Sequence, residues 1–497
     1  MLDLALLENW EHEGECAGGT RNPRKPIKKS IFKGPLPLKI LLLRPDAIGD
    51  MVLMIPLINT LKSHFPDAQL YTLQQGYTSP LLQEHPAISG VLIDRKKSGE
   101  AKGLRGFWQY AQWLREQRFD AVLMPYLEPY YARLMWAARI PIRIGDAQKV
   151  LLRPWLTHPI ALDYRNVMRH ECVQMAKLAE GLDPAIPFVS TMDLYLNATD
   201  RAACDACMHN LNITAPFILI HPASGGGNRP WSVAKYAALI AQILDKTPFH
   251  VVLTGAGKVE AHKVAAIMAQ VHPTPHRDMA RMVSAVDQTS LRTLMALIEK
   301  AEVVVGTDTG PTHIAAALKR PVLCISPTKF VKSLRWGPWE TPRQIISAAE
   351  ACDLVCRPYK CPATTCLDAI DTRRVFEALI AISREAHHGP MQSSLHIGIL
   401  IRDEADKAYY LTFSEFLQKE GFKVWILKAP RSPWRLLRHI WAHDLCVIHS
   451  RKAPLGWGLL RQIAALRMYI PPVWTADMAY QIQDLERVYQ RVFDTAH

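Results

Sequence analysis

The chain lacks the features that place a protein in a membrane or outside the cell. None of its apolar runs reaches the ~18–20 residues that a helix needs to span a bilayer. Acidic residues (Asp3, Glu8, Glu11) precede its first basic ones, which is atypical of a secretory signal. Apart from one cluster, its cysteines are scattered rather than arranged as a disulfide framework. We therefore expect a cytoplasmic protein in a reducing setting.

The chain also has fewer acidic than basic residues, 46 Asp and Glu against 59 Lys and Arg, so its formal net charge is +13. Such a charge fits a basic surface that only keeps the protein in solution. It also fits an anionic partner, such as a nucleotide, a phosphorylated glycolipid or a membrane face. No RRM-like, zinc-finger or helix-turn-helix signature is present, so nucleic acid is not the expected partner. Residues 1–35, where Arg and Lys mix with Pro and Gly, are predicted to form a flexible basic tail.

Strand-like apolar segments alternate with helical stretches in two successive series. The first series has such segments at 38–44, 69–74, 90–95 and 119–125, and the second at 216–222, 250–255, 302–308 and 321–326. This alternation predicts parallel sheets with crossover helices, whose ligands lie at the carboxyl ends of the strands. We expect an α/β fold with two Rossmann-like domains, 36–200 and 201–388, that face a cleft.

A third block, residues 389–497, follows the two series. Its segments LHIGILI, KVWILK and LCVIHS read as three strands with helices between them. The block is predicted to be a small extra α/β unit, and its role is unknown because it contains no catalytic motif.

The first chemical motif runs from Arg44 to Asp50, between a strand and a helix. Gly49 permits close backbone approach, and Asp50 falls at the predicted start of a helix, where the helix dipole stabilises a carboxylate. The alternative is that Asp46 or Asp50 only caps the helix.

The second motif, His221 to Trp231, is a glycine-rich turn that includes Ser224 and Gly225. Backbone N–H groups in such a turn bind phosphate at a helix start, and Arg229 could pair with a diphosphate. The turn is not GxGxxG and no acid lies at the ribose spacing, which argues against a nicotinamide cofactor. A plain surface loop is the alternative.

The third motif, Asp308-Thr309-Gly310, ends a strand and opens a helix with Pro311 in its first turn. The N–H groups of Thr309 and Gly310 are expected to be free for phosphate oxygens, and Asp308 could accept hydrogen bonds from sugar hydroxyls. His313 would lie one turn into the helix. A lone histidine there is more often structural.

Four cysteines, Cys352, Cys356, Cys361 and Cys366, lie close together in sequence and could bind Zn²⁺ tetrahedrally. Their spacing lacks CxxC pairs, so reduced cysteines in a compact loop are the favoured interpretation. We expect neither a metal nor a cofactor in the site.

The three motifs, together and in this order, resemble glycosyltransferase family 9, the ADP-heptose:lipopolysaccharide heptosyltransferases. The matching segments are LLLRPDAIGDMVLMIPLINTLKSHFPDA, HPASGGGNRPWSVAKY and DTGPTHIAAAL. The resemblance covers residues 38–385 and departs from the family at Ser326, where a Gly is usual.

This resemblance implies a GT-B architecture and an inverting, metal-independent transfer, with Asp50 as the catalytic base. Arg229 and the helix start at Thr309 and Gly310 would stabilise the diphosphate leaving group, while Asp308 holds the sugar near His313. The basic residues Arg133, Arg139, Arg143 and Lys149 are candidates for an acidic acceptor, or else form a solvated face.

The resulting prediction is transfer of heptose from ADP-heptose to a phosphorylated glycolipid of the lipopolysaccharide core, with peripheral contact at the inner face of the inner membrane. Three alternatives remain. They are a glycosyltransferase that uses another nucleotide sugar, a non-catalytic sugar-nucleotide-binding or scaffold protein, and a nicotinamide-dependent oxidoreductase.

Overall fold

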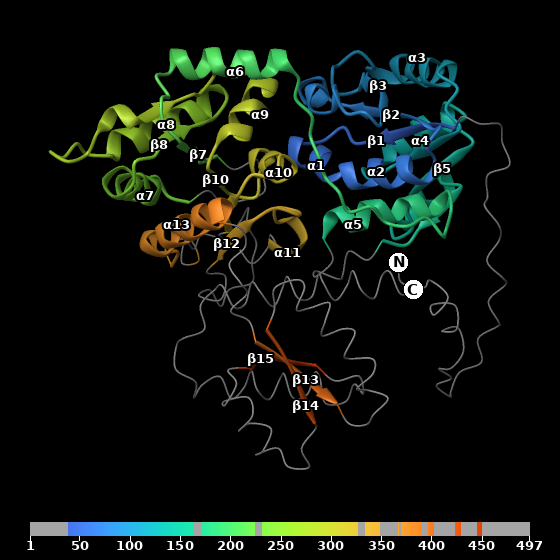
Figure 1. The fold of residues 1–497 in the computed structure, drawn as a ribbon. Coiled ribbons are helices and arrows are strands. Elements are labelled where there is room, and N and C mark those ends of the chain that lie inside the picture. The colour runs from blue at the N-terminus through green and yellow to red at the C-terminus, as the bar shows by residue number, and fades with distance from the viewer. Residues whose placement is uncertain are drawn as a thin grey trace. The chain divides into compact units, whose positions relative to one another are not determined.

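The computed structural model describes residues 38–162, 170–223, 231–326, 333–347, 366 and 369–388, together with three strands between 396 and 449. The chain divides into two compact units, Ser30–Gly389 and a second one made of Met1–Lys29 with Pro390–His497. The larger unit contains two parallel sheets (Figure 1). No helix within the described ranges is both long and apolar enough to cross a membrane.

The first sheet has six parallel strands in the order β3-β2-β1-β4-β5-β6. Their bounds are β1 (Lys39–Leu43), β2 (Gln69–Gln74), β3 (Ile88–Ile93), β4 (Ala121–Leu123), β5 (Ile142–Asp146) and β6 (His158–Ile160). Every residue of β1 after Lys39 is buried, as expected of a central strand covered on both faces. The strand order reverses beside β1, so the loop that follows β1 lies at the topological switch point.

Helices cover both faces of this sheet. One group contains α1 (Ile48–Leu53), α2 (Ile55–His64), α5 (Glu171–Ala176) and the 3-10 helix η4 (Lys177–Gly181), and η2 (Gly76–Leu82) packs against α1. The other contains α3 (Gly103–Glu116), α4 (Pro129–Ala137) and η3 (Val150–Trp155). The helical stretch after β1 is two helices that meet at Met54, because Pro56 has no N–H to continue the ladder.

The second sheet has the order β12-β11-β10-β7-β8-β9, which is the order of the first sheet when it is followed from β9 to β12. Its strands are β7 (Phe217–His221), β8 (His250–Leu253), β9 (Met282–Ser284), β10 (Val303–Gly306), β11 (Val322–Ser326) and β12 (Arg343–Ser347). Because β7 and β10 are neighbours at the reversal, the loops after both strands meet at the second switch point. The predicted α/β fold with two Rossmann-like sheets is therefore confirmed.

The helices of the second half also form two packed groups. The first is α7 (Val233–Lys246), α8 (Gly257–Gln270) and α13 (Thr372–His388), and the second is α6 (Ala198–Asn210), α9 (Leu291–Lys300) and α10 (Gly310–Ala317). A short helix, α11 (Ser333–Trp336), follows β11. Each half has its own apolar core, one around Leu41 and Leu43 and the other around Ile218 and Ile220.

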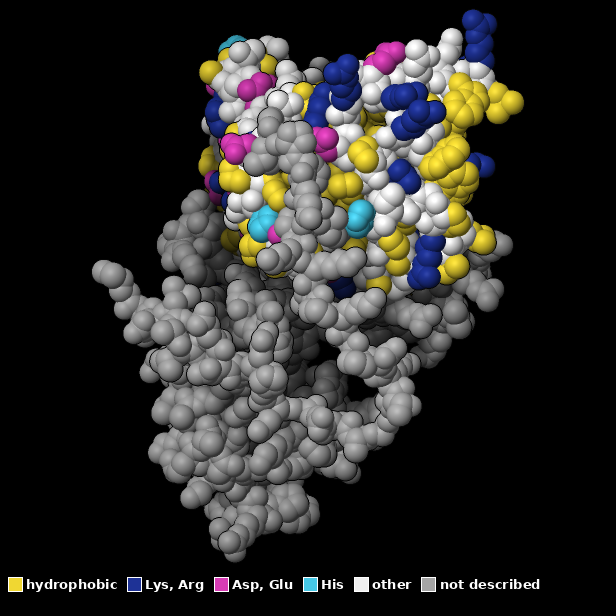
Figure 2. All heavy atoms as spheres, turned by 90° about the vertical axis from the view of Figure 1, so that its right-hand side faces the viewer, with side chains coloured by type: hydrophobic (Ala, Val, Ile, Leu, Met, Phe, Trp, Pro, Cys, Tyr) yellow, Lys and Arg dark blue, Asp and Glu magenta, His cyan; other side chains and the backbone are white. Residues whose placement is uncertain are grey.

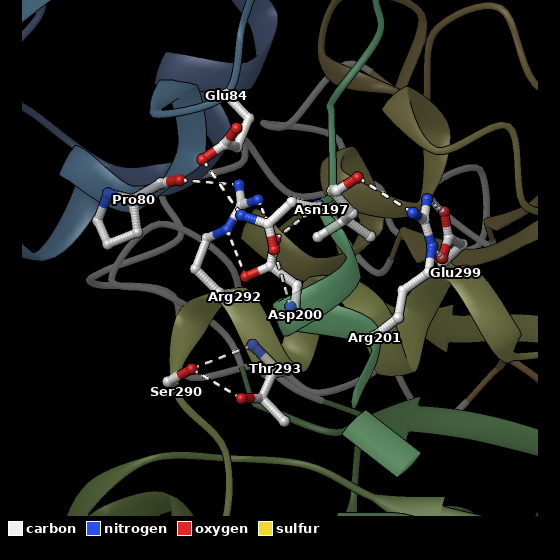
Figure 3. Close-up of polar contacts among 10 residues, drawn as sticks. Pro80, Glu84, Asn197, Asp200, Arg201, Ser290, Arg292, Thr293 and Glu299 are labelled. Atoms are coloured by element: carbon white, nitrogen blue, oxygen red, sulfur yellow. Dashed lines mark hydrogen bonds and ion pairs between the residues drawn. The ribbon is translucent and has the colours of Figure 1, made fainter. Parts of the chain in front are cut away.

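Helix α6 lies where the first half of the chain passes into the second. Asn197 caps it by accepting a hydrogen bond from the Asp200 N–H, and the Asp200 side chain bonds back to Asn197 N. Arg292 of α9 then donates to Asp200 and to the Pro80 carbonyl of the first half at 3.2 Å (Figure 3). The second half is thereby tied through Asp200 and Arg292 to η2.

The opposite side of the junction is held by separate contacts. The buried Glu171 of α5 pairs with Arg335 of α11 at 2.6 Å, and Trp339 Nε1 donates to the Ser190 carbonyl at 2.8 Å. His170 Nε2 bonds the Gly337 carbonyl at 2.9 Å, and burial lowers the pKa of His170 to about 3. A neutral imidazole therefore serves this contact at physiological pH.

The smaller unit contains β13 (His396–Ile401), β14 (Lys423–Lys428) and β15 (Leu445–His449). They form a parallel sheet in the order β14-β13-β15, which confirms the three strands predicted there. The helices expected between them lie outside the described residues.

Candidate active site

Arg44, directly after β1, is a buried guanidinium shared by two carboxylates. Its Nε lies 3.0 Å from Asp46 Oδ1, and its Nη2 donates to Asp50 Oδ1. Burial alone would lower the pKa of Arg44, but the charges of Asp50 and Asp46 outweigh it and raise that pKa. Arg44 is therefore a fixed cation that orients both carboxylates at the first switch point.

The two carboxylates differ in environment. Burial raises the pKa of Asp46 to about 7, against the opposing charge of Arg44 and with help from the negative charge of Asp50. The Asp46 carbonyl accepts hydrogen bonds from Gln75 Nε2 at 2.9 Å and from the Tyr77 hydroxyl at 3.0 Å. Gln75 and Tyr77 thus fix the loop. Sequence reasoning missed both, because they follow the neighbouring strand β2 and belong to no motif.

Neither aspartate is the cap of the helix that follows. Helix α1 begins after Ala47, which makes no side-chain capping bond, and Asp50 lies in the first helical turn. The capping interpretation of Asp46 and Asp50 is therefore wrong. Asp50 instead uses its side chain to pair with Arg44.

The start of α1 lies against the start of α10, with almost no space between them. A Cβ atom on Gly49 would lie 2.7 Å from His313 Cδ2, and one on Gly310 would lie 2.7 Å from Ile48 Cγ2. Both distances are shorter than a normal carbon–carbon contact, so a larger residue at either position would force the facing side chain or helix to move. The two glycines bring the loop after β1 in the first half within contact of the loop after β10 in the second.

The loop after β10 is internally bonded. His313 Nε2 lies 2.8 Å from Asp308 Oδ1, and His313 Nδ1 is buried without a hydrogen-bond partner among the described residues. The expectation that the Thr309 N–H is free is wrong, because it donates to Thr312 Oγ1 at 3.2 Å. The hydroxyl of Thr312 completes a capping box at this helix start, which leaves the Gly310 amide as the remaining candidate of the pair.

The glycine-rich turn after β7 falls largely outside the described residues, including Ser224, Gly225 and Arg229. Its two ends are described. Thr307 Oγ1 donates to the Ala223 carbonyl at 3.2 Å, which joins the loops after β7 and β10. Lys263 of α8 reaches the Pro222 carbonyl at 2.5 Å, and burial lowers its pKa to about 8. Lys263 is a cation beside this turn that no sequence motif marks.

The basic residues considered for an acceptor make contacts of their own. Arg143 uses its guanidinium on the carbonyls of Trp155 and Ile140, and Lys149 donates to the Leu127 carbonyl at 2.5 Å. Arg133, on α4, donates to the Pro129 carbonyl, and Arg139 is exposed after the end of that helix. These contacts stay within the first half and do not reach Asp50.

Of the four clustered cysteines, Cys366 is half-buried and Cys352, Cys356 and Cys361 lie outside the described residues. Among the residues that are described, no group of three or more His, Cys, Asp or Glu side chains is arranged to hold a metal ion.

Known proteins are similar to this chain in sequence and in fold. The sequence model of glycosyltransferase family 9 (heptosyltransferase) matches residues 107–366. An Escherichia coli lipopolysaccharide heptosyltransferase 3 is 26% identical over 296 residues, which cover 59% of this chain and 83% of that protein. A putative glycosyltransferase from Haemophilus influenzae is also 26% identical, over 60% of this chain and 86% of its own.

Solved structures agree on the architecture. The E. coli ADP-heptose lps heptosyltransferase II superposes with a TM-score of 0.55 at 22% identity, over 70% of this chain and 100% of that one. E. coli heptosyltransferase WaaC with ADP gives 0.52 at 15% identity, over 69% of this chain and 100% of that one. The match to the family's sequence extends over more than half of the chain, and its two sheets have the GT-B arrangement of these structures. The chain therefore belongs to glycosyltransferase family 9, the heptosyltransferase family, and is a glycosyltransferase.

Proposed function

We propose that this chain is an inverting heptosyltransferase that moves a heptose from ADP-heptose to a phosphorylated acceptor of the lipopolysaccharide core. The observation that carries the proposal is a contact between two loops. The loop with the Arg44–Asp50 pair touches the loop with the Asp308–His313 pair, and Gly49 lies at the contact. A base and a sugar-binding group on facing strand ends are what a single displacement at an anomeric carbon requires. The names of the E. coli relatives supply the donor and the acceptor class.

The proposed chemistry is one step. An acceptor hydroxyl attacks the anomeric carbon, its proton passes to Asp50, and the bond to the diphosphate oxygen breaks on the opposite face. Arg44 holds Asp50 Oδ1, so we assign the proton transfer to Oδ2. Asp308 and His313 would position the sugar. The Gly310 amide, with Ser224, Gly225 and Arg229 of the turn after β7, would stabilise the charge that gathers on ADP, without metal or cofactor.

The acceptor would approach from the first half. Arg133 and Arg139 are exposed there and are the proposed contacts for its phosphates. Arg143 and Lys149 have a supporting role, because their side chains hold backbone carbonyls. We place the enzyme in the cytoplasm, in peripheral contact with the inner membrane.

Asp50→Asn tests the assignment of the base. The amide keeps the shape of the side chain but accepts no proton, so kcat should fall by about 10²- to 10⁴-fold. ADP binding, measured by calorimetry, should stay within about threefold, since Asp50 contacts the acceptor side. Asp67→Asn, an exposed aspartate after α2, is the matched control. A wild-type kcat in Asp50→Asn would remove the carboxylate from the mechanism.

The donor is tested by calorimetry with ADP, ADP-heptose, UDP and UDP-sugars. We expect selective binding of the adenine nucleotides, and Asp308→Ala should weaken ADP-heptose binding about tenfold, and more than it weakens ADP binding. Preference for a uridine nucleotide would point to another nucleotide sugar. Nucleotide binding with no transfer to any acceptor would instead favour the non-catalytic alternative.

A further inference from the structure

Apolar side chains stand in solvent on one side of the first half. Leu104 and Leu151 are 82% and 89% exposed, and Trp108 and Trp136 are 57% and 49% exposed. Leu104 and Trp108 are one turn apart on the outer face of α3, whose inner face buries Tyr110 and Leu114 instead. Burial in the core therefore cannot explain why these large apolar residues are present.

These side chains belong to one continuous surface. α3 packs against α4, and α4 packs against η3. The Phe107 ring contacts both Trp108 and Tyr130 of α4, with ring centroids 5.6 and 5.5 Å apart, respectively. Trp136 of α4 contacts Trp155 of η3 at 5.2 Å. We call this surface the α3–α4–η3 face.

The charges on the α3–α4–η3 face are almost all positive. Its three helices carry Arg105, Arg115, Arg133 and Arg153 against a single acid, Glu116. All four arginines are exposed. Figure 2 views the larger unit from the side that is at the right in Figure 1, and Lys, Arg and hydrophobic side chains recur over it while acidic ones are few.

We propose that the α3–α4–η3 face docks on an anionic lipid bilayer. Leu104, Trp108, Trp136 and Leu151 would enter the boundary between headgroups and acyl chains, and the arginines would lie among lipid phosphates. A bilayer surface offers apolar and anionic groups side by side, and tryptophan with arginine is the composition that suits it. The inference deepens the proposed function and takes from it only that the acceptor is lipid-linked.

The surface favours a bilayer over a protein partner. A protein interface gathers its apolar residues in a core with a polar rim, whereas on this face arginines alternate with the apolar residues along each helix, as on helices that lie in a membrane interface. Docking there would keep the first half, with its exposed basic residues, beside the membrane that holds a lipid-linked acceptor.

The test is co-sedimentation of the full chain with vesicles of phosphatidylethanolamine and phosphatidylglycerol, with pure phosphatidylcholine vesicles for comparison. We expect binding to the anionic vesicles that weakens at least about tenfold when salt rises from ~0.1 to ~0.5 M. The double variant Trp108→Ser with Leu151→Ser should bind about tenfold or more weakly, and Arg105→Glu should act in the same direction.

Matched controls come from α8 in the second half. Val259, 84% exposed, and its neighbour Lys258 are an apolar and a basic residue outside the face, so Val259→Ser and Lys258→Glu should leave vesicle binding unchanged. Melting temperatures verify that each variant is folded, which is expected because every changed side chain is exposed.

Several results would overturn the proposal. One is the absence of binding to either kind of vesicle, and another is equal loss of binding in the face variants and the α8 variants. A third is a dimer in analytical ultracentrifugation that Leu151→Ser dissociates, without any vesicle binding, since the face would then be covered by a second copy. An assay of heptose transfer to a detergent-solubilised acceptor separates the two proposals. The double variant Trp108→Ser with Leu151→Ser should keep this activity, because the acceptor is no longer in a bilayer. If wild type itself shows no transfer, only the proposed function is contradicted.

Discussion

Arg44, Asp46 and Asp50 form a unit with one cation and two acids, and the acids are not equivalent. Asp50 lies in the first turn of α1 and pairs with Arg44. Asp46 is held where burial favours the neutral form, and its pKa of about 7 keeps part of the population protonated near neutral pH. The proton on Asp46 reduces repulsion within the pair and lets Arg44 serve Asp50.

This arrangement makes stability depend on pH. The folded chain keeps a proton on Asp46 up to about pH 7, whereas the unfolded chain releases it near the usual aspartate pKa of about 4. The folded state therefore binds more protons between these values, and its free energy of unfolding should fall as pH rises from about 4 to about 7. Above that range the contribution is constant.

Asp46→Asn should abolish this dependence, because the amide does not titrate. Between pH 5 and pH 8 the variant should gain about 1–3 kcal/mol of unfolding free energy relative to wild type. Chemical denaturation at the two pH values measures the difference. Asp67→Asn, at an exposed site, is the control, and its unfolding free energy should depend on pH as that of wild type does. If the unfolding free energies of Asp46→Asn and wild type change with pH in the same way, the pKa assignment of Asp46 is wrong.

Among single residues of the candidate site, the sequence can predict those that belong to one contiguous motif. Asp50, Asp308, Gly310 and His313 are such residues, because strand, turn and helix start follow one another along the chain. Gln75, Tyr77 and Lys263 reach the same loops from other strands and helices. Their contacts depend on the register of β1 with β2 and on the packing of α8, neither of which a linear pattern contains.

Among the elements, the contact of α1 with α10 is the one on which the site depends most. Gly49→Ala would place a methyl group 2.7 Å from the His313 ring, which is buried and has little room to move. The helices must then separate, at a cost of about 1–3 kcal/mol. Since Asp50 and Asp308 lie on opposite sides of this contact, kcat/KM should fall by about ten- to a hundredfold.

Steady-state kinetics together with the melting temperature measure this effect. Gly76→Ala is the matched control, because Gly76 also begins a helix but its nearest neighbour for a Cβ atom is Ile93 Cγ2, at an ordinary 3.9 Å. Full activity in Gly49→Ala would mean that the two helix starts need not touch.

Elements with a strong pattern are predictable from sequence, and those without one are not. The apolar runs of β1, β7 and β10 mark central strands, and the structure buries every residue of all three except Lys39. The strand β6 is only three residues long and includes a proline, so it carries no alternation. The break between α1 and α2 depends on one proline, whose effect is local and easily absorbed into a longer helical pattern.

For the whole molecule, the junction near Arg292 decides how firmly the halves are held. Arg292 and Asp200 are both about nine-tenths buried, and their contact continues to the Pro80 carbonyl of the first half. Arg292→Ala would leave Asp200 without its partner cation and Pro80 without a donor. The unfolding free energy should fall by about 1–3 kcal/mol.

Arg201→Ala is the comparison, because Arg201 pairs with Glu299 in a more exposed contact within the second half. That change should cost no more than about 1 kcal/mol. Denaturant titrations of the two variants distinguish the sites, and equal losses would show that Arg292 contributes nothing through the first half.

Each half keeps all the strands of its own sheet, and neither sheet borrows a strand from the other. The halves are therefore exchangeable modules, and a chimera could combine this first half with the second half of a relative. Its success would depend on the contacts of the junction, among them the small area where Ile48 and Gly49 meet Gly310 and His313. A donor module with a larger residue in place of Gly310 would press a Cβ atom to 2.7 Å from Ile48 Cγ2, so the fit between two modules should depend on the residue at this one position.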